Sequence, residues 1–433
     1  REGTWSLIDA RKNGRKLPSQ GEKEESNILF DWRKRAVFRA TLDPGQMNRF
    51  DCHLSRVPQK PKPKLKPKNG RIRFKTDDME VVINCRTGFV DTYRVAGEDH
   101  LAKGAFRPIV LHDNADPWGM TTEGFRKRKV AGRFKLLSKQ EGTRFSGVDA
   151  GLIDSVRVIE DGEVRAVVEA VFGYGDSFVA QRYKLPKRGT EFEVETRVYW
   201  NEKDRMLKLS IPTPVRGGTL AGQVAYGWQE LPDDGSEAVA QKWVAVSCPH
   251  RKQSLTVIDD GVYGCDFKTG ELRLSLLRSP AYSAHPIGDP LLVLQDRFTP
   301  RSDQGERLFR FWVNAGPTTG RIDAVDREAL VRNEAPPALS FYPSGHGEKP
   351  GAFVTLSDKA VQVAACKKAE DDDKHLVVRL FEPTGRGRTT TLEVPFAGIK
   401  EKVKLAPFEL KTLRIDTARR LVTETDLLER MIR

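Results

Sequence analysis

Two polar loops carry the residues whose types and spacing point to chemistry. The first lies within residues 271–316, where two strand-like segments flank the stretch 281–302. That stretch is longer than the about 12–15 residues of a usual unstructured connection, and such loops are commonly functional or disordered. Its interspersed charges and prolines favour an ordered site loop. The side chains that can act in or beside it are Tyr282, His285, Asp289, Asp296, Arg297 and Asp303.

The second loop, HDNADPWGMTT at 112–122, places Trp118 beside Asp113, Asn114 and Asp116. A sugar site needs an aromatic ring face for the C–H groups of the sugar and carboxylates or amides for its hydroxyls. The alternative is that Trp118 anchors the loop to its own sheet. Both interpretations stay open on the sequence.

Paired carboxylates are a further possibility. A retaining glycosidase needs two carboxyl groups about 5–5.5 Å apart, one of them with a raised pKa. Asp113, Asp116, Asp303 and Glu306 lie in loop segments that can bring two of them together. The more common alternative for each residue is a solvated acid or one that caps a nearby backbone turn.

Other catalytic motifs are missing from the sequence. No two of the seven histidines are spaced for a shared metal, and no cysteine pair has C-x-x-C spacing. A Gly-x-Ser-x-Gly motif is absent, and the Gly-Arg-Gly at 385–387 lies among strands, where it is a turn. The five scattered cysteines predict reduced thiols and a cytoplasmic protein.

The net charge of +13 allows two interpretations, a polyanion partner or a basic but mixed surface. Interspersed acids, and no zinc-finger, RRM or helix-turn-helix pattern, favour the mixed surface and predict no nucleic-acid partner. Residues 58–70, PQKPKPKLKPKNG, are predicted to be an extended connector, with a nucleic-acid-binding tail as the alternative. The sequence contains no run of 18 apolar residues, so no membrane span is predicted.

Strand patterns dominate the chain and predict an all-β fold. About 250 residues of strand pattern follow the connector, too many for one sandwich of about 100 residues, so a large supersandwich is expected. We predict the end of a small β-domain at 1–57, the connector at 58–70, the large supersandwich at 71–325 and a smaller β-sandwich with a tail at 326–433. The chain start, with its strand-like alternation and no Met, is expected to fall inside a domain. One helix is expected at 321–333.

Several blocks resemble the C-terminal half of the α-mannosidases of glycoside hydrolase family 38. In that family, a strand that ends in arginine precedes a loop and an Asp-x-Gly turn, which match Arg278 and then Asp303 and Gly305. The matching blocks are LRLSLLRSPAY (272–282), DQGERLFRFW (303–312), VETRVYWNEKDRMLKLSIP (194–212), QKWVAV (241–246), GVYGCDFKTGELRLS (261–275), DPWG (116–119) and SQGEKEESNILFDWRKRAVF (19–38).

The resemblance implies a galactose-mutarotase-like supersandwich that belongs to a retaining, zinc-dependent α-mannosidase. The family's catalytic barrel, with its zinc ligands and catalytic aspartates, has no match here. The chain alone is therefore expected to be inactive, with no catalytic and no metal-binding residue, and zinc is implied for the parent enzyme only. The implied role is to shape one wall of the pocket for α-mannosides and to stabilise the barrel. The implied wall residues are Arg278, Ser279, Tyr282, Asp303, Gly305, Asp116 and Trp118.

One departure and several alternatives accompany the resemblance. The family turn commonly reads Asp-x-Gly-x-His, whereas this chain has Arg307 at the last position. An autonomous carbohydrate-binding β-sandwich is the main alternative. A mutarotase-like epimerase would need His112 or His285 as its catalytic histidine, and a nucleic-acid binder ranks below it. The expected partners are α-mannosides and the upstream barrel, with a homo-oligomer possible and no membrane.

Overall fold

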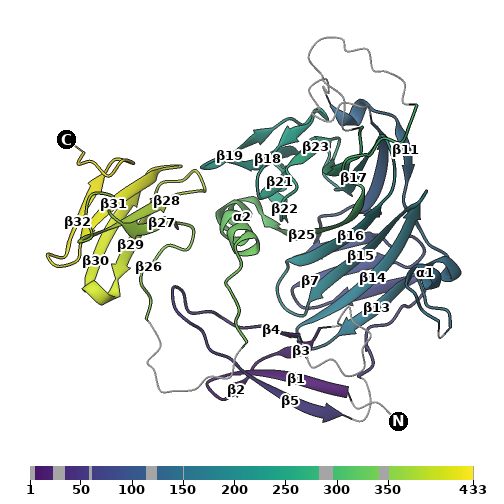
Figure 1. Cartoon of the computed structure of the whole chain (residues 1–433), viewed down its shortest axis with the longest axis horizontal. Coiled ribbons are helices and arrows are strands. Elements are labelled where there is room, and N and C mark those ends of the chain that lie inside the picture. Colours follow the sequence, from purple (N-terminus) through teal and green to yellow (C-terminus); the bar gives the residue numbers. More distant parts are fainter. Residues whose placement is uncertain are drawn as a thin grey trace.

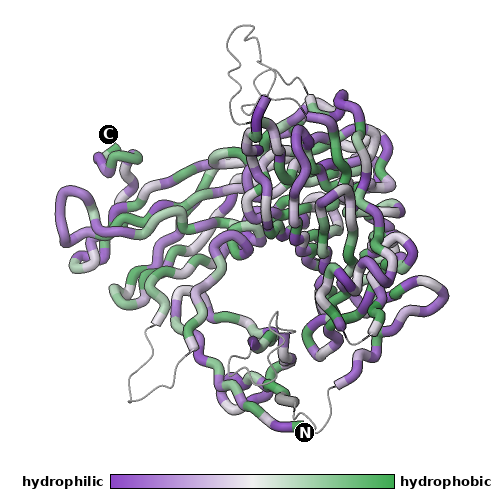
Figure 2. The backbone as a smooth tube through the Cα atoms, turned by 45° about the vertical axis from the view of Figure 1, so that its right-hand side comes forward, coloured by the Kyte–Doolittle hydropathy of each residue, from purple (hydrophilic) through white to green (hydrophobic). Residues whose placement is uncertain are grey.

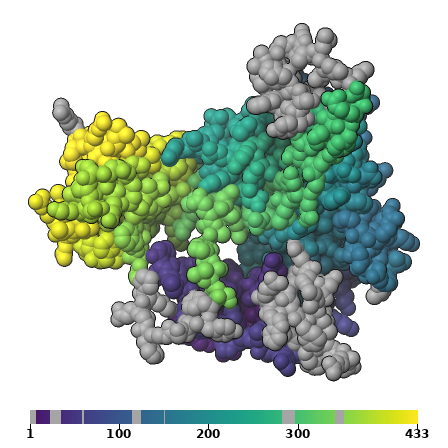
Figure 3. All heavy atoms as spheres, viewed as in Figure 1, coloured from purple at the N-terminus to yellow at the C-terminus, as the bar shows by residue number. Residues whose placement is uncertain are grey.

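The computed structural model describes residues 5–22, 35–57, 61–113, 124–149, 151–281, 296–340 and 351–432. Within them the protein has three parts, which Figures 1 and 3 show in purple, in blue to green, and in yellow. Two small sheets form the N-terminal part, a large sandwich forms the middle, and a smaller sandwich ends the chain. This arrangement confirms the prediction of an all-β protein with a large supersandwich followed by a smaller one.

Three sheets build the large sandwich. The four-stranded sheet consists of β6 (Arg71–Lys75), β7 (Met79–Asn84), β8 (Val90–Val95) and β9 (Glu98–Asp99). The six-stranded sheet has the order β11 (Val130–Arg133), β10 (Arg107–His112), β17 (Arg205–Pro212), β24 (Glu271–Arg278), β23 (Gly264–Lys268) and β20 (Ala238–Val239). The ten-stranded sheet has the order β12 (Lys135–Leu136), β14 (Arg165–Tyr174), β15 (Ser177–Pro186), β16 (Phe192–Trp200), β25 (Gly305–Pro317), β22 (Gln253–Asp259), β21 (Trp243–Cys248), β18 (Thr219–Val224) and β19 (Gly227–Leu231), with β13 (Val156–Asp161) beside β14.

A single apolar core joins these three sheets. Residues along β15 alternate strictly between buried and half-buried, as expected for a strand with one face on a core. Polar and apolar residues alternate in the same way along many strands in Figure 2. Across the core, the rings of Tyr93 on β8 and Phe192 on β16 lie 5.0 Å apart, edge to face. The four-stranded and ten-stranded sheets therefore pack face to face through large aromatic side chains.

Consecutive strands β24 and β25 belong to opposite layers. The alternation in 271–316 correctly predicts both strands, and β24 ends at Arg278, before Pro280. However, β24 pairs with β17 and β23, whereas β25 pairs with β16 and β22. The connection between them therefore passes from the six-stranded sheet to the middle of the ten-stranded sheet.

Few helices accompany the strands in the described residues. They are η1 (Phe125–Lys127), α1 (Lys139–Phe145), α2 (Thr318–Asn333) and η2 (Pro395–Ala397). The predicted helix at 321–333 is confirmed as α2, which starts three residues earlier and packs Ile322, Val325 and Ala329 against Trp243 and Trp312 of the ten-stranded sheet. None of these helices is long and apolar enough to cross a membrane.

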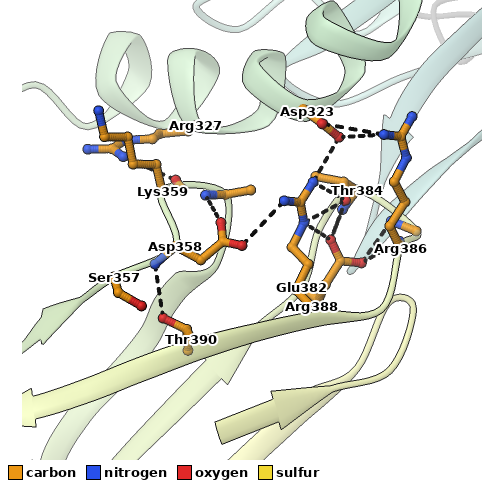
Figure 4. A network of polar contacts seen from close by, with 12 residues as sticks. Asp323, Arg327, Ser357, Asp358, Lys359, Glu382, Thr384, Arg386, Arg388 and Thr390 are labelled. Atoms are coloured by element: carbon orange, nitrogen blue, oxygen red, sulfur yellow. Dashed lines mark hydrogen bonds and ion pairs between the residues drawn. The ribbon is translucent and has the colours of Figure 1, made fainter. Parts of the chain in front are cut away.

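The small sandwich has two sheets around its own core. One sheet contains β26 (Thr355–Leu356), β29 (Arg388–Val394) and β30 (Ile399–Leu405). The other contains β27 (Gln362–Lys368), β28 (His375–Phe381), β31 (Leu410–Asp416) and β32 (Leu421–Thr425). A polar network fastens this sandwich to α2, and Figure 4 shows Arg388 at its centre. Arg388 pairs with Asp323 of α2 at 2.8 Å, with Glu382 at 3.2 Å and with Asp358 at 3.4 Å.

The N-terminal part has a three-stranded sheet, β2-β1-β5, and a two-stranded sheet, β3-β4. The strands are β1 (Trp5–Lys12), β2 (Arg15–Lys16), β3 (Ser19–Gly21), β4 (Ala36–Phe38) and β5 (Asp51–Val57). The Gln20 side chain contacts the large sandwich, since its oxygen accepts hydrogen bonds from the N–H groups of Val164 and Arg165 at 3.0 and 2.9 Å. The chain divisions predicted at 57, 70 and 325 stay predictions.

Candidate functional site

The candidate site lies on the polar face of the six-stranded sheet. We use this name for the face turned away from the core, which carries Lys208, Asp266, Ser275 and Arg278. The opposite face buries Leu207, Leu209, Leu272, Leu274, Cys265 and Phe267 in the core. Alternation along β17, β23 and β24 therefore sends apolar side chains inward and this polar set outward.

Arg278 is the last residue of β24, and a buried carboxylate holds its side chain. Its Nε donates to Asp113 Oδ2 at 2.7 Å and its Nη2 to Asp113 Oδ1 at 2.9 Å. The Asp113 side chain is fully buried and the Arg278 side chain is 17% exposed. Arg128 adds a second cation 3.8 Å from Asp113. Two parallel charge-assisted hydrogen bonds fix the guanidinium in one orientation.

Phe125, the first residue of η1, lies among three cations. The Arg278 guanidinium carbon is 4.9 Å from its ring centroid, and Arg128 and the Lys208 ammonium are each at 5.7 Å. The negative face of an aromatic ring attracts cations at such distances. Phe125 packs with Leu111 and Met206 in a small apolar cluster, so η1 covers this end of the polar face.

A buried ionic network occupies the rest of the polar face. The Lys208 side chain is fully buried and binds Asp266 and, at 2.6 Å, Glu237. Arg126 bridges Asp266 at 2.5 Å and Glu271 at 3.0 Å. Burial acts to raise the pKa of Glu271, but hydrogen bonds and charges from neighbours such as Arg273 lower it overall. The negative charges of these carboxylates are consequently balanced by the cations of the network.

The Asp303 turn also touches Arg278. Asp303 Oδ2 accepts a hydrogen bond of 3.2 Å from the Arg278 backbone N–H, and Asp303 has a positive φ of 54°. Gly305, with a φ of 113°, follows and starts β25 opposite Trp200. The predicted neighbours Arg278, Asp303 and Gly305 are thus brought together. Glu306 lies elsewhere, since it pairs with Arg197.

Ser279, the next residue along the chain, lies behind the polar face. Its side chain is buried, and its hydroxyl donates to the carbonyl of Arg205 at 3.1 Å. Its own carbonyl accepts the N–H of Asp204, whose carbonyl accepts the N–H of Asp113. These backbone hydrogen bonds link Asp204, in the turn before β17, to Ser279 on one side and to Asp113 on the other. Tyr282, Asp116 and Trp118 lie outside the described residues, so their place in the wall stays a prediction, and the same holds for His285 and Asp289.

The sequence names Asp113 as a candidate site carboxylate but does not reveal that it is the partner of Arg278. It gives no indication of two other contributors. Phe125 is the first of them. Arg301 is the second, since it holds Asp204 through two hydrogen bonds of 3.0 and 3.1 Å. Asp113 and Arg278 are 165 positions apart. The available signal was the apolar and basic run FRKRKV at 125–130, which no helix or strand pattern explains.

The described residues do not offer a metal site. No group of three or more His, Cys, Asp or Glu side chains converges among them. The acids nearest Arg278 and those beside Lys208 already form ion pairs with cationic side chains, which compete with a metal ion for them. The resemblance implies zinc for the parent enzyme only, and the described residues hold no group that fits such an ion.

Two family models match the chain. The glycosyl hydrolases family 38 C-terminal domain matches residues 79–289, which include Asp113 and Arg278. The glycosyl hydrolases family 38 C-terminal beta sandwich domain matches residues 360–433, most of the small sandwich. The chain belongs to the C-terminal part of glycosyl hydrolase family 38. The resemblance seen in the sequence is therefore confirmed, and the family is one of glycoside hydrolases.

Individual relatives agree with this assignment to family 38. Alpha-mannosidase G of Dictyostelium discoideum is 24% identical over 300 residues, which cover 60% of this chain and 26% of that protein. Alpha-mannosidase 2C1 of Mus musculus is 23% identical over 336 residues, or 73% of this chain and 28% of that protein. A solved α-mannosidase from Enterococcus faecalis V583 shares the fold, with a TM-score of 0.65 and 14% identity over 95% of this chain and 51% of that one. The chain thus spans about a quarter of these curated relatives.

Proposed function

We propose that this chain is the non-catalytic C-terminal portion of a retaining, zinc-dependent α-mannosidase, which releases terminal α-mannosyl residues. In this proposal the polar face around Arg278 forms one wall of the sugar pocket, and the sandwiches stabilise the catalytic barrel. Zinc and the catalytic carboxylates belong to residues outside this part of the enzyme. The five separated cysteines, none of which is in a disulfide, support a cytoplasmic location.

The observation that carries this proposal is the fixed guanidinium of Arg278 within the segment that matches family 38. A guanidinium donates hydrogen bonds to sugar hydroxyls, which accept them well. Because Asp113 and Phe125 already hold the side chain, little conformational entropy is lost when a sugar binds. The wall is therefore pre-organised before any substrate arrives.

The first test is an activity assay on the chain alone. Purified protein with added zinc is mixed with an aryl α-mannoside, and release of the aryl group is followed by absorbance. We expect no turnover above background, because the described residues offer no group that could hold zinc. Robust turnover would contradict the non-catalytic role.

A second test separates the wall from an autonomous binding module. Mannose is titrated into the chain alone while tryptophan fluorescence is recorded. A pocket wall without its floor should give no saturable change. Saturation at micromolar mannose would instead establish a self-sufficient carbohydrate-binding sandwich.

A third test addresses Arg278 directly, in a form of the protein that includes a catalytic region. Arg278→Lys keeps the charge but loses the two-pronged pairing with Asp113, so we expect KM for an α-mannoside to rise about tenfold. Arg310→Lys is the control, because Arg310 also pairs with a carboxylate, that of Asp260 at 2.8 Å, and lies away from the polar face. Equal KM values for the two variants would exclude Arg278 from the wall.

A further inference from the structure

A dense group of cations surrounds the turn that leads into β6. We call it the basic hairpin and define it by Lys62, Lys64, Lys66, Lys68, Arg71 and Arg86. All six side chains are exposed. The segment 61–75 contains seven lysines and arginines and no acid.

The backbone of the basic hairpin is fixed at both ends. Asp161 accepts hydrogen bonds from the N–H groups of Lys64 and Leu65 at 2.8 and 2.7 Å. At the turn, Lys68 and Arg71 exchange backbone hydrogen bonds of 2.8 and 3.1 Å. Asn69 and Gly70 form this tight turn with φ angles of 51° and 71°. The lysines are therefore held in place by an ordered chain, and Pro61, Pro63 and Pro67 stiffen it further.

The turn gathers cations from separate segments. It folds Lys66 and Lys68 back toward Arg71, and Arg86 approaches from the loop after β7. A Cβ atom placed on Gly70 would lie 3.8 Å from Arg86 Nε. None of the six defining side chains has an ion pair within the described residues, whereas neighbouring Arg73 pairs with Glu80 at 2.8 Å. Several like charges held together in this way attract a partner of opposite charge.

The surroundings of the basic hairpin discriminate between classes of polyanion. Single-stranded nucleic acids bind where aromatic side chains stack on bases, but the one aromatic residue in the segment, Phe74, is buried in the core. Stable membrane anchoring needs an apolar group that inserts into the lipid in addition to cations, but Leu65, which lies among the lysines, packs against the core. An anionic polysaccharide needs only spaced charges on an exposed, extended surface.

We propose that the basic hairpin binds an anionic glycan, such as a sulfated or phosphorylated polysaccharide. The choice of glycan over other polyanions rests in part on the proposed function, since a glycoside hydrolase acts on carbohydrate. This surface lies on β6 and its connector, apart from the polar face that carries Arg278. It would retain a charged glycan on the protein independently of the sugar pocket.

The test measures binding, so its result does not depend on catalytic activity. Fluorescently labelled dextran sulfate is titrated with the chain, and anisotropy is recorded at low and at near-physiological salt. We expect binding that weakens with salt, and no binding of uncharged dextran of equal size. Changing Lys62, Lys64, Lys66 and Lys68 to Gln should weaken binding about tenfold to a hundredfold. Because the four substituted side chains are exposed, the variant should stay folded, which circular dichroism checks.

A matched control comes from β30, where Lys400, Lys402 and Lys404 are also exposed at alternate positions. There Glu401 is interspersed and Lys400 pairs with Glu393 at 2.8 Å, so changing these three to Gln should leave binding unchanged. Two results would overturn the proposal: equal binding by the hairpin variant and the unaltered chain, or tighter binding of a single-stranded oligonucleotide or of vesicles of phosphatidylcholine and phosphatidylserine than of dextran sulfate.

Discussion

At the scale of single residues, the pair of Asp113 and Arg278 meets a structural demand. A carboxylate that is completely buried must be matched by a cation with good geometry, because an unpaired buried charge is strongly unfavourable. The two hydrogen bonds from Arg278 meet this demand. The arginine thus has a defined orientation within the chain itself.

Replacing Asp113 with Asn tests this dependence. The variant removes the carboxylate charge that pairs with the guanidinium of Arg278, so we expect the free energy of unfolding to fall by about 2–3 kcal/mol. Glu306→Gln is the control, because it breaks a pair with Arg197 whose acid is 57% exposed, and such surface pairs contribute about 1 kcal/mol or less. Urea unfolding followed by fluorescence gives both values, and similar losses would contradict the argument.

Asp259 predicts a pH dependence of stability. Burial raises its pKa to about 7, against the effect of hydrogen bonds from the N–H groups of Gly261 and Val262, and the nearby Asp260 raises it further. In the unfolded chain an aspartate titrates near about 3.9. Between these values the folded state keeps a proton that the unfolded state loses, so stability falls as pH rises from about 4 to about 7 and is constant above.

The variant Asp259→Asn removes this titration while its amide oxygen still accepts both backbone hydrogen bonds. We expect it to be more stable than the unaltered protein at pH 8, by at most about 4 kcal/mol, and to show no such gain near pH 4. Urea midpoints measured across this range provide the test. A stability difference that is the same at every pH would show that Asp259 does not titrate in this window.

The sequence predicts only part of the candidate site. Whether a site residue can be recognised depends on the local pattern around it. Arg278 and Asp303 are recognisable because one ends a strand and the other begins a turn. The pairing of Arg278 with Asp113 cannot be read from spacing, since it depends on how β10 and β24 flank β17. Phe125 gives little signal because η1 has only three residues.

At the scale of elements, the turn between β23 and β24 positions the polar face. Thr269 and Gly270 form this tight turn with φ angles of 48° and 83°. A Cβ atom on Gly270 would lie 2.2 Å from the carbonyl oxygen of Val215. Backbone atoms cannot yield as a flexible side chain does, so glycine is required here for space as well as for its positive φ.

Gly270→Ala should therefore destabilise the large sandwich by about 2–4 kcal/mol. Gly189→Ala separates the two causes, because Gly189 also has a positive φ, 88°, but has nothing within 4 Å of its expected Cβ. The control should lose only about 1 kcal/mol. Denaturant titrations of the two variants provide the comparison, and equal losses would attribute the whole effect to φ.

Element types follow from the sequence more readily than element partners do. Alternation reveals β16, β24 and β25, because it reports which side chains are buried. It carries no information on which strand lies next to which, so the placement of β24 and β25 in opposite layers could not be predicted. Helix α1 was missed because its seven residues show little periodicity, although Ser138 and Glu141 form a capping box at its start.

At the scale of the whole molecule, the large and small sandwiches are joined through α2. Arg388 is 16% exposed and contacts three carboxylates from separate segments, whereas neighbouring Arg386 is 45% exposed and pairs only with Asp323 among the described acids. Trp228 of β19 adds a hydrogen bond of 3.2 Å to the carbonyl of Thr384. The small sandwich is thus fastened at one end, around the loop that follows β28 (Figure 4).

Arg388→Met should loosen this joint, because it leaves buried Glu382 without its cation. We expect the free energy of unfolding of the small sandwich to fall by about 3 kcal/mol, and Arg386→Met to cost less than about 1 kcal/mol. Hydrogen exchange along β28 and β29 reports this difference. Protection that is unchanged in the Arg388 variant would show that the joint contributes little.

The position of β25 has a consequence for synthesis of the protein. The ten-stranded sheet contains β16 on one side of β25 and β22 on the other, both of which leave the ribosome earlier. Until residues 305–317 emerge, the nascent chain holds two half-sheets with open edges, and such edges readily pair with other chains. A ribosome that stalls before Gly305 would therefore release an aggregation-prone product, whereas one that stalls after Pro317 would release a chain in which β25 can join the two half-sheets.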